Sequence, residues 1–293
     1  MNKILAWLGL SRVPFLFVGI LPYLLGAVLA HKQNAAVFFL GLAGVVLIML
    51  STYYAGEYWD YEGDKLSPEF KFSGGTRVML KGILPRTAPL TGSFVTLLLA
   101  AAVGLVLQFY YRTGPWTLPL GFVGMIGGFF YSTRPVRWVA TGTGELWIAF
   151  CYGWLPVAVG YYLLRGAFSP VIFFISLPIA CATFNVILLN EFSDYEADLA
   201  TGKRNLTVRL GKQRAAFLYV FVAILMSLAA FFAVPALAVP YLPVFALSLA
   251  LIFFMMRGAW HDIRRLEVIC GLNILVNLAI PVVYMAAFLW KNI

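Results

Sequence analysis

Two acidic segments of eight residues share one pattern. The first covers residues 57–64 and reads EYWDYEGD, and the second covers residues 191–198 and reads EFSDYEAD. Together they hold eight of the 12 Asp and Glu residues in a chain of 293 residues. Side chains at i and i+4 of a helix share a face, and like charges at that spacing destabilise the helix. We therefore expect Asp60 to align with Asp64 and Asp194 with Asp198, each pair neutralised by a divalent cation.

Basic residues follow each acidic segment. Arg77 and Lys81 come after the first segment, and Lys203 and Arg204 come after the second. Carboxylates alone suit a simple cation site, whereas carboxylates with nearby Arg and Lys suit a polyanionic substrate held through a metal. Mg²⁺ takes a few carboxylates together with phosphate oxygens and water, and Arg and Lys bind phosphate directly. The pattern predicts a Mg²⁺-dependent diphosphate site.

The composition places this site beside a membrane. Hydrophobic residues make up 62% of the chain and charged residues 11%, and the mean hydropathy is +0.89, as in integral membrane proteins. A diphosphate beside a membrane cavity indicates an isoprenoid diphosphate, whose allylic carbon–oxygen bond ionises while cations stabilise the leaving group. Aromatic faces can shield the allylic cation. The candidates near the membrane surface are Tyr53, Tyr54, Tyr58, Trp59, Tyr131, Phe184 and Phe192.

Nine apolar runs have about the 17 to 25 residues that a helix needs to cross the bilayer. They are continuous rather than alternating, which excludes barrel strands. The expected spans are 13–31, 36–56, 88–110, 116–133, 145–165, 169–190, 214–236, 241–257 and 268–290. The expected fold is an all-α integral membrane protein with nine transmembrane helices around a central cavity, in one domain over residues 1–293. We expect the first span to be retained rather than cleaved as a leader.

Charge predicts the orientation. With a cytoplasmic N-terminus, all of the 21 Lys and Arg residues except Lys32, Arg112, Arg165 and Lys291 lie inside, as the positive-inside rule requires. All 12 acidic residues fall on the same side, so the catalytic loops 57–87, 134–144 and 191–213 are expected to be cytoplasmic. The net charge of +9 follows from topology and contact with anionic lipid, and no nucleic acid partner is expected.

Over nearly its whole length the chain resembles the UbiA superfamily of intramembrane aromatic prenyltransferases. Members carry NDxxDxxxD after the second helix and DxxxD, often followed by GKR, after the sixth. The corresponding residues here are Gly56-Glu57-x-x-Asp60-x-x-x-Asp64, Asn190-Glu191-x-x-Asp194-x-x-x-Asp198 and Gly202-Lys203-Arg204. The resemblance implies that the protein binds two Mg²⁺ ions. It also implies that the protein lies in a prokaryotic cytoplasmic membrane. The implied metal residues are Glu57, Asp60, Asp64, Asn190, Glu191, Asp194 and Asp198.

The resemblance also implies substrate contacts. Arg77 falls at the position of an Arg that binds diphosphate in the family. The segment 131–137 is similar to a loop that closes on the substrate, and Arg12-Val13-Pro14 is similar to the entry of the first helix. The expected diphosphate-binding residues are Arg77, Lys81, Arg134, Arg137, Lys203 and Arg204. The expected residues of the substrate pocket are Arg12, Tyr58, Tyr131 and Ser132.

One position departs from the family pattern. Gly56 stands where the first motif has Asn, and Glu57 stands where Asp follows it. Glycine supplies no side-chain oxygen to a metal. Either the longer Glu57 side chain takes over the contact or an additional water does.

Two short segments indicate a branch of the family. Phe72-Ser73-Gly74-Gly75-Thr76-Arg77 and Gly144-Glu145-Leu146 resemble the branch that prenylates 1,4-dihydroxy-2-naphthoate in menaquinone biosynthesis. Acceptors of the same fold left open are 4-hydroxybenzoate, homogentisate, a glycerol-ether lipid and a tetrapyrrole. A membrane cation transporter is an alternative of another class, because intramembrane acids mark ion pathways and repeats are frequent in transporters. Here, however, the acids gather at one membrane face.

Overall fold

The computed structural model describes residues 2–73, 75–233 and 238–291. Gly74 and the last three residues of the predicted span 214–236 lie outside the described residues. The α-helices are α1 (Lys3–Leu10), α2 (Val13–Leu29), α3 (Ala35–Trp59), α4 (Tyr61–Leu66), α5 (Ala88–Leu105), α6 (Thr117–Ser132), α7 (Gly144–Ala149), α8 (Leu155–Arg165), α9 (Pro170–Ala200), α10 (Leu206–Leu210), α11 (Lys212–Ala233), α12 (Ala238–Met256) and α13 (Ile263–Lys291). A π-helical turn, Val106–Tyr110, extends α5, and another, Phe150–Trp154, joins α7 to α8.

The helices match the predicted apolar runs. Among the described residues, seven helical segments are long and apolar enough to cross a membrane. They are Ala35–Trp59, Ala88–Tyr110, Gly144–Arg165, Pro170–Ala200, Lys212–Ala233, Val239–Met256 and Ile263–Trp290. α1 and α2, bent by 44° relative to each other, add an eighth if they form one span, and the apolar α6 has 16 residues. The all-α membrane class is therefore confirmed, whereas helix length and composition give seven or eight spans.

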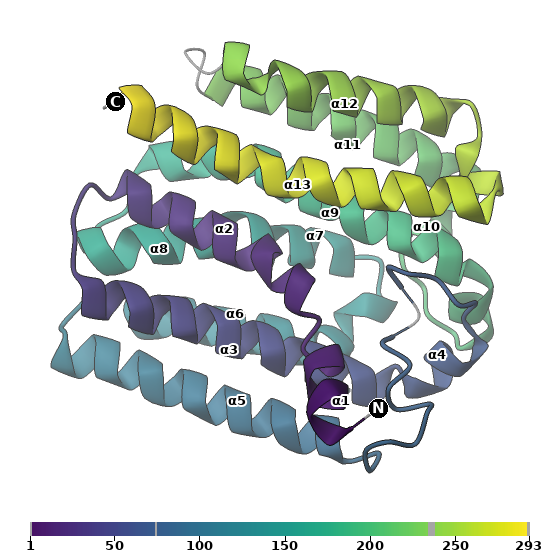
Figure 1. Ribbon diagram of the computed structural model, residues 1–293, viewed down its shortest axis with the longest axis horizontal. Coiled ribbons are helices and arrows are strands. Elements are labelled where there is room, and N and C mark those ends of the chain that lie inside the picture. The colour runs from purple at the N-terminus through teal and green to yellow at the C-terminus, as the bar shows by residue number, and fades with distance from the viewer. Residues whose placement is uncertain (1, 74, 234–237, 292–293) are drawn as a thin grey trace.

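The long helices run side by side along the length of the molecule (Figure 1), and their contacts close into a ring. In ring order they are α2, α3, α5, α6, α8, α9, α11, α12 and α13, and α13 packs back onto α2. Across the ring α2 also packs on α8, where a Cβ on Gly26 would collide with the carbonyl oxygen of Val157 and a Cβ on Gly160 with that of Tyr23. Small residues at such crossings let membrane helices approach closely. These two glycines therefore let the backbones of α2 and α8 approach closely.

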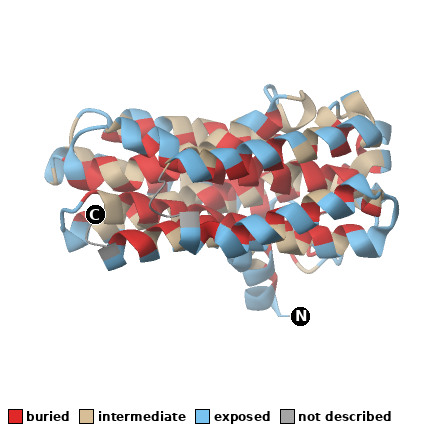
Figure 2. Ribbon diagram, turned by 90° about the horizontal axis from the view of Figure 1, so that it is seen from above, coloured by how far each residue is buried: buried red, intermediate tan, exposed pale blue. Residues whose placement is uncertain are grey.

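The outward faces of the helices are apolar. Leu98, Phe232 and Val239 are 71%, 70% and 74% exposed. In Figure 2 the buried residues lie between the helices, and exposed residues cover the outside and the ends. In water such large exposed apolar surfaces would promote aggregation, but in a bilayer they face lipid. The structure is thus that of a multi-pass membrane protein.

The two acidic segments are carried by different local structures at the same end of the bundle (Figure 1). The 31 residues of α9 extend about 46 Å at about 1.5 Å per residue, which is longer than the roughly 30 Å of hydrocarbon that a span must cross. The predicted continuous helix is wrong for the first segment. α3 ends at Trp59, Asp60 has φ −90° and ψ 0°, and α4 begins at Tyr61. Asp64 N still donates to Asp60 O at 2.9 Å.

Candidate active site

An open cavity of about 230 Å³ lies between the two acidic segments. Asp60 and Asp64 line it from the first segment, and Asp194 and Asp198 line it from the second. The segments therefore face each other across a cavity, as their repetition predicted. The remaining polar lining residues are Arg12, Thr52, Tyr53, Ser73, Tyr131, Ser132, Tyr152, Thr183, Asn190, Glu191, Lys203 and Asn205.

Lys203 connects the two segments. Its Nζ lies 3.2 Å from Asp60 Oδ1 and 3.2 Å from Asp198 Oδ1, and its side chain is 11% exposed. Burial opposes the charge of this ammonium group, but the carboxylates of Asp60 and Asp198 outweigh burial and raise the pKa of Lys203. One buried cation therefore holds both halves of the cavity together.

Asp60 also contacts the chain that follows α6. Ser132 Oγ donates to Asp60 Oδ2 at 2.7 Å, and Arg137 Nη2 lies 3.5 Å from Asp60 Oδ1. Burial raises the pKa of Asp60, but Lys203, Ser132 and Arg137 together lower it below the ordinary value. Asp60 is therefore ionised. Ser132 and Arg137, both predicted from the sequence, meet the first acidic segment here.

Asp64 is less well compensated. Burial first, and then the charges of Asp60 and Glu57, raise its pKa to about 7, against the opposing effects of Lys203 and Arg12. The carboxylate lies directly over Gly75, where a Cβ would collide with Asp64 Oδ2. Gly75 also has a φ of +70°, in the left-handed region that favours glycine. The loop can approach Asp64 only because residue 75 has no side chain.

Replacing Gly75 should therefore disturb Asp64. Gly75→Ala is expected to lower the turnover number by roughly 100-fold, because a shift of about 1 Å in a reacting group can cost that much. Gly82→Ala is the matched control: its φ is +65°, and a Cβ there would meet nothing within 4 Å. The two variants carry similar backbone strain and differ in the collision with Asp64. Equal activities in a turnover assay would contradict this role of Gly75.

Short polar bridges hold the second segment. Ser73 Oγ donates to Asp194 Oδ1 at 3.2 Å and lies 2.6 Å from Ser193 Oγ, so the first loop reaches across to α9. Asn205 Nδ2 donates to Asp198 Oδ2 at 2.7 Å, while Asn205 Oδ1 accepts from Val208 N at 2.9 Å and caps α10. The sequence analysis did not single out Asn205. An Asn before a short apolar run is an N-cap signal that would have identified it.

Glu57 is already engaged within the protein. Its Oε1 accepts from Arg12 Nη2 and from Thr76 N, each at 2.9 Å, and its Oε2 accepts from Thr76 Oγ1 at 2.9 Å. Glu57 is 3% exposed. These contacts take three of the roughly four lone-pair positions of a carboxylate. Glu57 thus joins the start of α2 to the first loop with one lone-pair position not used by these contacts, and it is not among the residues that line the cavity.

Two further buried carboxylates hold the loop that carries Lys203. Glu145 Oε1 accepts from Leu206 N at 2.6 Å, and Glu191 Oε2 accepts from Thr207 N at 3.1 Å. Glu145 and Glu191 are 1% and 8% exposed. They therefore fix the first turn of α10, directly after Lys203 and Asn205. The sequence indicated Glu145 as a branch marker but gave it no role in the site.

A stability measurement tests the role of Glu145. Glu145→Ala leaves the N–H group of Leu206 without its acceptor and is expected to lower the free energy of unfolding by about 1–3 kcal/mol. Glu145→Gln keeps an acceptor oxygen and is expected to melt at or above the wild-type temperature. Thermal unfolding in detergent micelles compares the two variants. A Gln variant as unstable as the Ala variant would show that the charge, rather than the acceptor, matters.

The oxygen atoms of these side chains suit Mg²⁺ ions whose remaining ligands come from a substrate. Within the described ranges, no group of three or more His, Cys, Asp or Glu side chains converges closely enough to hold a metal by itself. The buried Asn190 Oδ1, which lines the cavity side of α9, accepts no hydrogen bond from the described residues. The carboxylate of Asp64 is likewise not fully compensated, because burial, Asp60 and Glu57 raise its pKa more than Lys203 and Arg12 lower it. Mg²⁺ prefers this arrangement, a few protein oxygens completed by phosphate and water.

Several predicted residues lie away from the cavity wall. Arg77 Nη2 donates to the carbonyl oxygens of Ser67 and Pro68, each at 2.7 Å. Lys81, Arg134 and Arg204 are exposed on the loops, and Tyr58 packs edge-on against Trp59 with ring centroids 5.4 Å apart. For these residues, contact with diphosphate or acceptor stays a prediction. Arg12, Tyr131 and Ser132 do line the cavity.

Aromatic rings form much of the apolar wall. Phe15, Tyr53, Phe72, Tyr131 and Tyr152 line the cavity, and the Tyr53 hydroxyl donates to the carbonyl of Phe15 at 3.2 Å. Aromatic faces are suited to stabilising a carbocation. The sequence analysis named Tyr53 and Tyr131 as aromatic candidates but named Phe72 only in a branch motif. It missed Phe15 and Tyr152, which come from apolar runs where aromatic residues are common.

The chain is similar to proteins of one family. Residues 19–268 match the UbiA prenyltransferase family. The chain is 28% identical to the 1,4-dihydroxy-2-naphthoate octaprenyltransferase of Bacillus subtilis over 70% of its own length and 66% of that protein, just under two thirds of the relative. It is also 28% identical to the digeranylgeranylglyceryl phosphate synthase of Thermococcus kodakarensis, over 82% of this chain and 78% of that protein.

A solved structure shares the fold. It is that of a UbiA homolog from Archaeoglobus fulgidus bound to DMAPP and Mg²⁺, with a TM-score of 0.62 and 16% sequence identity. The alignment covers 94% of this chain and 99% of that one. At this identity the likeness concerns the fold alone.

Proposed function

The chain belongs to the UbiA prenyltransferase family, and on this premise we propose that it transfers a polyprenyl group from an allylic polyprenyl diphosphate to an aromatic acceptor in a Mg²⁺-dependent reaction. The observation that carries the proposal is the cavity lined by both acidic segments and bridged by Lys203. Its carboxylates outnumber its cations, so it suits a substrate that arrives with metal ions. Its aromatic wall suits the carbocation that forms when diphosphate leaves.

We propose that two Mg²⁺ ions bind with the diphosphate. Asp60 and Asp64 would hold one with Glu57 at its remaining position, and Asp194 and Asp198 would hold the other with Asn190 and Glu191. When bound, the metal ions would neutralise the charge that builds on the departing diphosphate. Lys203 and Arg137, already beside Asp60, would donate to diphosphate oxygens. Arg77, Lys81, Arg134 and Arg204 are proposed to reach it when the loops close.

The proposed aromatic acceptor is 1,4-dihydroxy-2-naphthoate, which would place the enzyme in menaquinone biosynthesis. The likeness to the Bacillus subtilis octaprenyltransferase supports this acceptor. The ring would lie near Arg12 and Tyr131 on the cavity wall, with Tyr58 and Ser132 beside it. The guanidinium group of Arg12 is positively charged and can attract the carboxylate of a naphthoate.

We propose nine membrane spans, in which α1 with α2 and the short α6 each cross the bilayer. The N-terminus and the active site would then face the cytoplasm of a prokaryotic cell, in accord with the distribution of Lys and Arg. The polyprenyl tail would enter from the surrounding lipid. Both acidic segments lie at one end of the bundle, which supports a site at one face of the membrane.

A glycerol-ether lipid is the second candidate acceptor. The likeness to the digeranylgeranylglyceryl phosphate synthase covers more of the chain than that to the octaprenyltransferase. Such an acceptor is a phosphorylated alcohol rather than an aromatic ring. Its phosphate would compete for the same cations as the diphosphate.

Release of diphosphate tests the reaction class. Purified protein in detergent, given Mg²⁺, geranylgeranyl diphosphate and 1,4-dihydroxy-2-naphthoate, is expected to release diphosphate only when all three are present. Glycerol phosphate bearing one ether-linked tail replaces the naphthoate in a parallel reaction. No release with either acceptor, together with Mg²⁺ flux into proteoliposomes, would favour a transporter and overturn the proposal.

A further inference from the structure

The first helix of the chain, α1, is apolar on two faces. Ala6 and Leu10 are fully buried, whereas Ile4, Leu5 and Leu8 are 69%, 52% and 53% exposed. Residues three and four positions apart share a face of a helix, so the three exposed side chains form one surface, called here the α1 patch. In Figure 2 the helix at the N-terminus projects sideways from the bundle. An exposed apolar surface of this kind marks a contact site.

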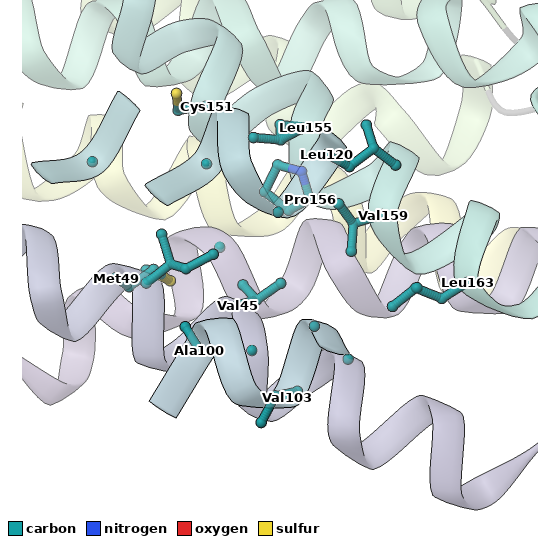
Figure 3. Close-up of a pocket in the computed structure, with 18 of the residues that line it drawn as sticks. Val45, Met49, Ala100, Val103, Leu120, Cys151, Leu155, Pro156, Val159 and Leu163 are labelled. Carbon is teal, nitrogen blue, oxygen red and sulfur yellow. The ribbon is translucent and has the colours of Figure 1, made fainter. Parts of the chain in front are cut away.

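α1 lies at the level of the membrane boundary. The apolar interior of the bundle contains the cavity of Figure 3, which α3 lines with Val45 and Met49. Trp7 of α1 instead packs edge-on against Tyr54 of α3, five residues nearer to Asp60, with ring centroids 5.3 Å apart. Figure 1 shows α1 beside the end of α5. Its eight residues extend about 12 Å at about 1.5 Å per residue, too short to cross the roughly 30 Å of hydrocarbon.

Two exposed cations accompany the α1 patch. Lys3 begins α1, and Lys81 follows Val78 and Met79, which pack on α1. Neither lysine pairs with an acid among the residues that the structure describes. An apolar helical face with nearby lysines is typical of helices that lie at the surface of an anionic membrane. The charge and the apolar patch therefore both suit phospholipid.

A second copy of the chain suits the α1 patch less well. A stable protein–protein interface buries about 800 Å² on each partner, which is more than three aliphatic side chains can supply. A two-fold interface would also bring together the lysines of both copies, and like charges at an interface are costly.

The opposite face of α1 holds the first loop. Val78, Met79 and Leu84 of this loop are buried in one cluster with Ala6 and Leu10 of α1. A Cβ on residue 9 would lie 3.2 Å from the Val78 side chain, so helix and loop are in close contact. A force on α1 is therefore passed directly to residues 78–84.

We propose that the α1 patch, with Lys3 and Lys81, docks on anionic phospholipid of the membrane that surrounds the protein, and that this contact holds the first loop over the acidic cavity. Arg12, directly after α1, binds Glu57, and Glu57 accepts from Thr76 of the same loop. The lipid thus acts on the loop through two sets of contacts. The inference concerns lipid binding and goes beyond the transfer of a prenyl group.

Lipid binding tests the surface. Native mass spectrometry measures the binding constants of phosphatidylglycerol and phosphatidylcholine to the protein without substrate, so the proposed contact of Lys81 with diphosphate does not enter. A cation near an anionic surface contributes about 1 kcal/mol, or about fivefold in a binding constant. Lys3→Gln with Lys81→Gln should therefore lower the preference for phosphatidylglycerol by about tenfold or more. The matched control, Arg214→Gln with Arg264→Gln, removes two exposed cations of α11 and α13 and should change it by less than about twofold.

A spin label tests the position of α1. The native cysteines Cys151, Cys181 and Cys270 are first replaced by alanine. A nitroxide is then attached at Leu8→Cys or, as the control, at Glu196→Cys in the exposed part of the second acidic segment, and the protein is placed in phosphatidylglycerol nanodiscs. We expect the label at residue 8 to collide mainly with oxygen, which dissolves in lipid, and the label at residue 196 with a water-soluble nickel chelate.

Hydrogen exchange tests the link to the first loop. Amide exchange over residues 78–84 is expected to be about fivefold or more slower in phosphatidylglycerol than in phosphatidylcholine nanodiscs, because lipid that binds the ordered loop stabilises it by mass action. The difference should disappear in Lys3→Gln with Lys81→Gln.

The outcomes are distinct. Equal binding of the two lipids, or an equal loss in the arginine control, would reject the surface, and dipolar broadening between labels at residue 8 would assign the α1 patch to a second copy and overturn the inference. Unchanged exchange over residues 78–84 would reject the link to the loop. If the double variant does not fold, Lys3→Gln alone decides, with an expected loss of about fivefold. Release of diphosphate enters none of these measurements, so failure of the proposed function leaves the inference standing.

Discussion

Asp60→Ala and Asp194→Ala are each expected to lower the turnover number by about 100- to 1000-fold or more, the scale of losing one electrostatic contact that stabilises a transition state. Each substitution removes an acid that faces the cavity from a different segment. Asp60→Ala also removes the carboxylate that Lys203 and Arg137 contact, so it is expected to lower the unfolding temperature. Asp194→Ala relieves repulsion between like charges and is not expected to lower it. Turnover and thermal unfolding in detergent, with and without Mg²⁺, check both expectations.

Matched controls lie within the same segments. Glu196 is an exposed acid in the second segment, and Glu62 in the first is paired with Lys65 and Arg86 on the surface. Glu196→Ala and Glu62→Ala are expected to retain most of the activity. Mg²⁺ should raise the unfolding temperature of these controls in the presence of a prenyl diphosphate, but not that of Asp194→Ala. Full activity of Asp60→Ala or Asp194→Ala would reject the metal assignment.

Lys203→Met is expected to have the largest effect on stability. It keeps an unbranched apolar chain but removes the cation that lies 3.2 Å from both Asp60 and Asp198. Breaking a buried pair by removing one partner costs about 3–5 kcal/mol, so the variant should unfold at a lower temperature without Mg²⁺. Turnover should fall by at least about 100-fold, because the same cation would contact the diphosphate.

Mg²⁺ provides a second readout for Lys203. With the ammonium gone, Asp60 and Asp198 lose the cation that lies between their carboxylates, and Mg²⁺ should stabilise Lys203→Met more than the wild type. Arg204→Met is the control, because Arg204 is the exposed neighbour in the same loop. A Lys203→Met protein with wild-type stability and no added response to Mg²⁺ would show that this bridge is not important.

The sequence analysis predicted the helices because the bilayer imposes a strict length and polarity on them. Each predicted span corresponds to an observed helical segment, and the second acidic segment continues α9 as expected. The break at Asp60 was not predicted, because residues 57–64 are compatible with a continuing helix. Tertiary contacts accompany the end of α3, because Asp60 is held by Ser132, Lys203 and Arg137 from distant parts of the chain.

The site was only partly predictable for a similar reason. Acidic spacing identified the four aspartates that line the cavity. It could not show that Glu57 binds Arg12 and Thr76, nor that Arg77 donates to the backbone of its own loop. Those contacts depend on how the first loop folds back over the bundle. Glu145 was missed as a site residue because its role is to hold Leu206, 61 residues away.

The product of the reaction tests the central claim most directly. The purified protein is incubated with Mg²⁺, geranylgeranyl diphosphate and a panel of acceptors comprising 1,4-dihydroxy-2-naphthoate, 4-hydroxybenzoate, homogentisate and the glycerol phosphate ether, and the products are identified by mass spectrometry. We predict a prenylated naphthalene ring, formed at the expense of the diphosphate and absent with Asp194→Ala. A prenylated glycerol ether in its place would contradict the assigned acceptor, and no prenylated product from any acceptor would contradict the proposed transferase.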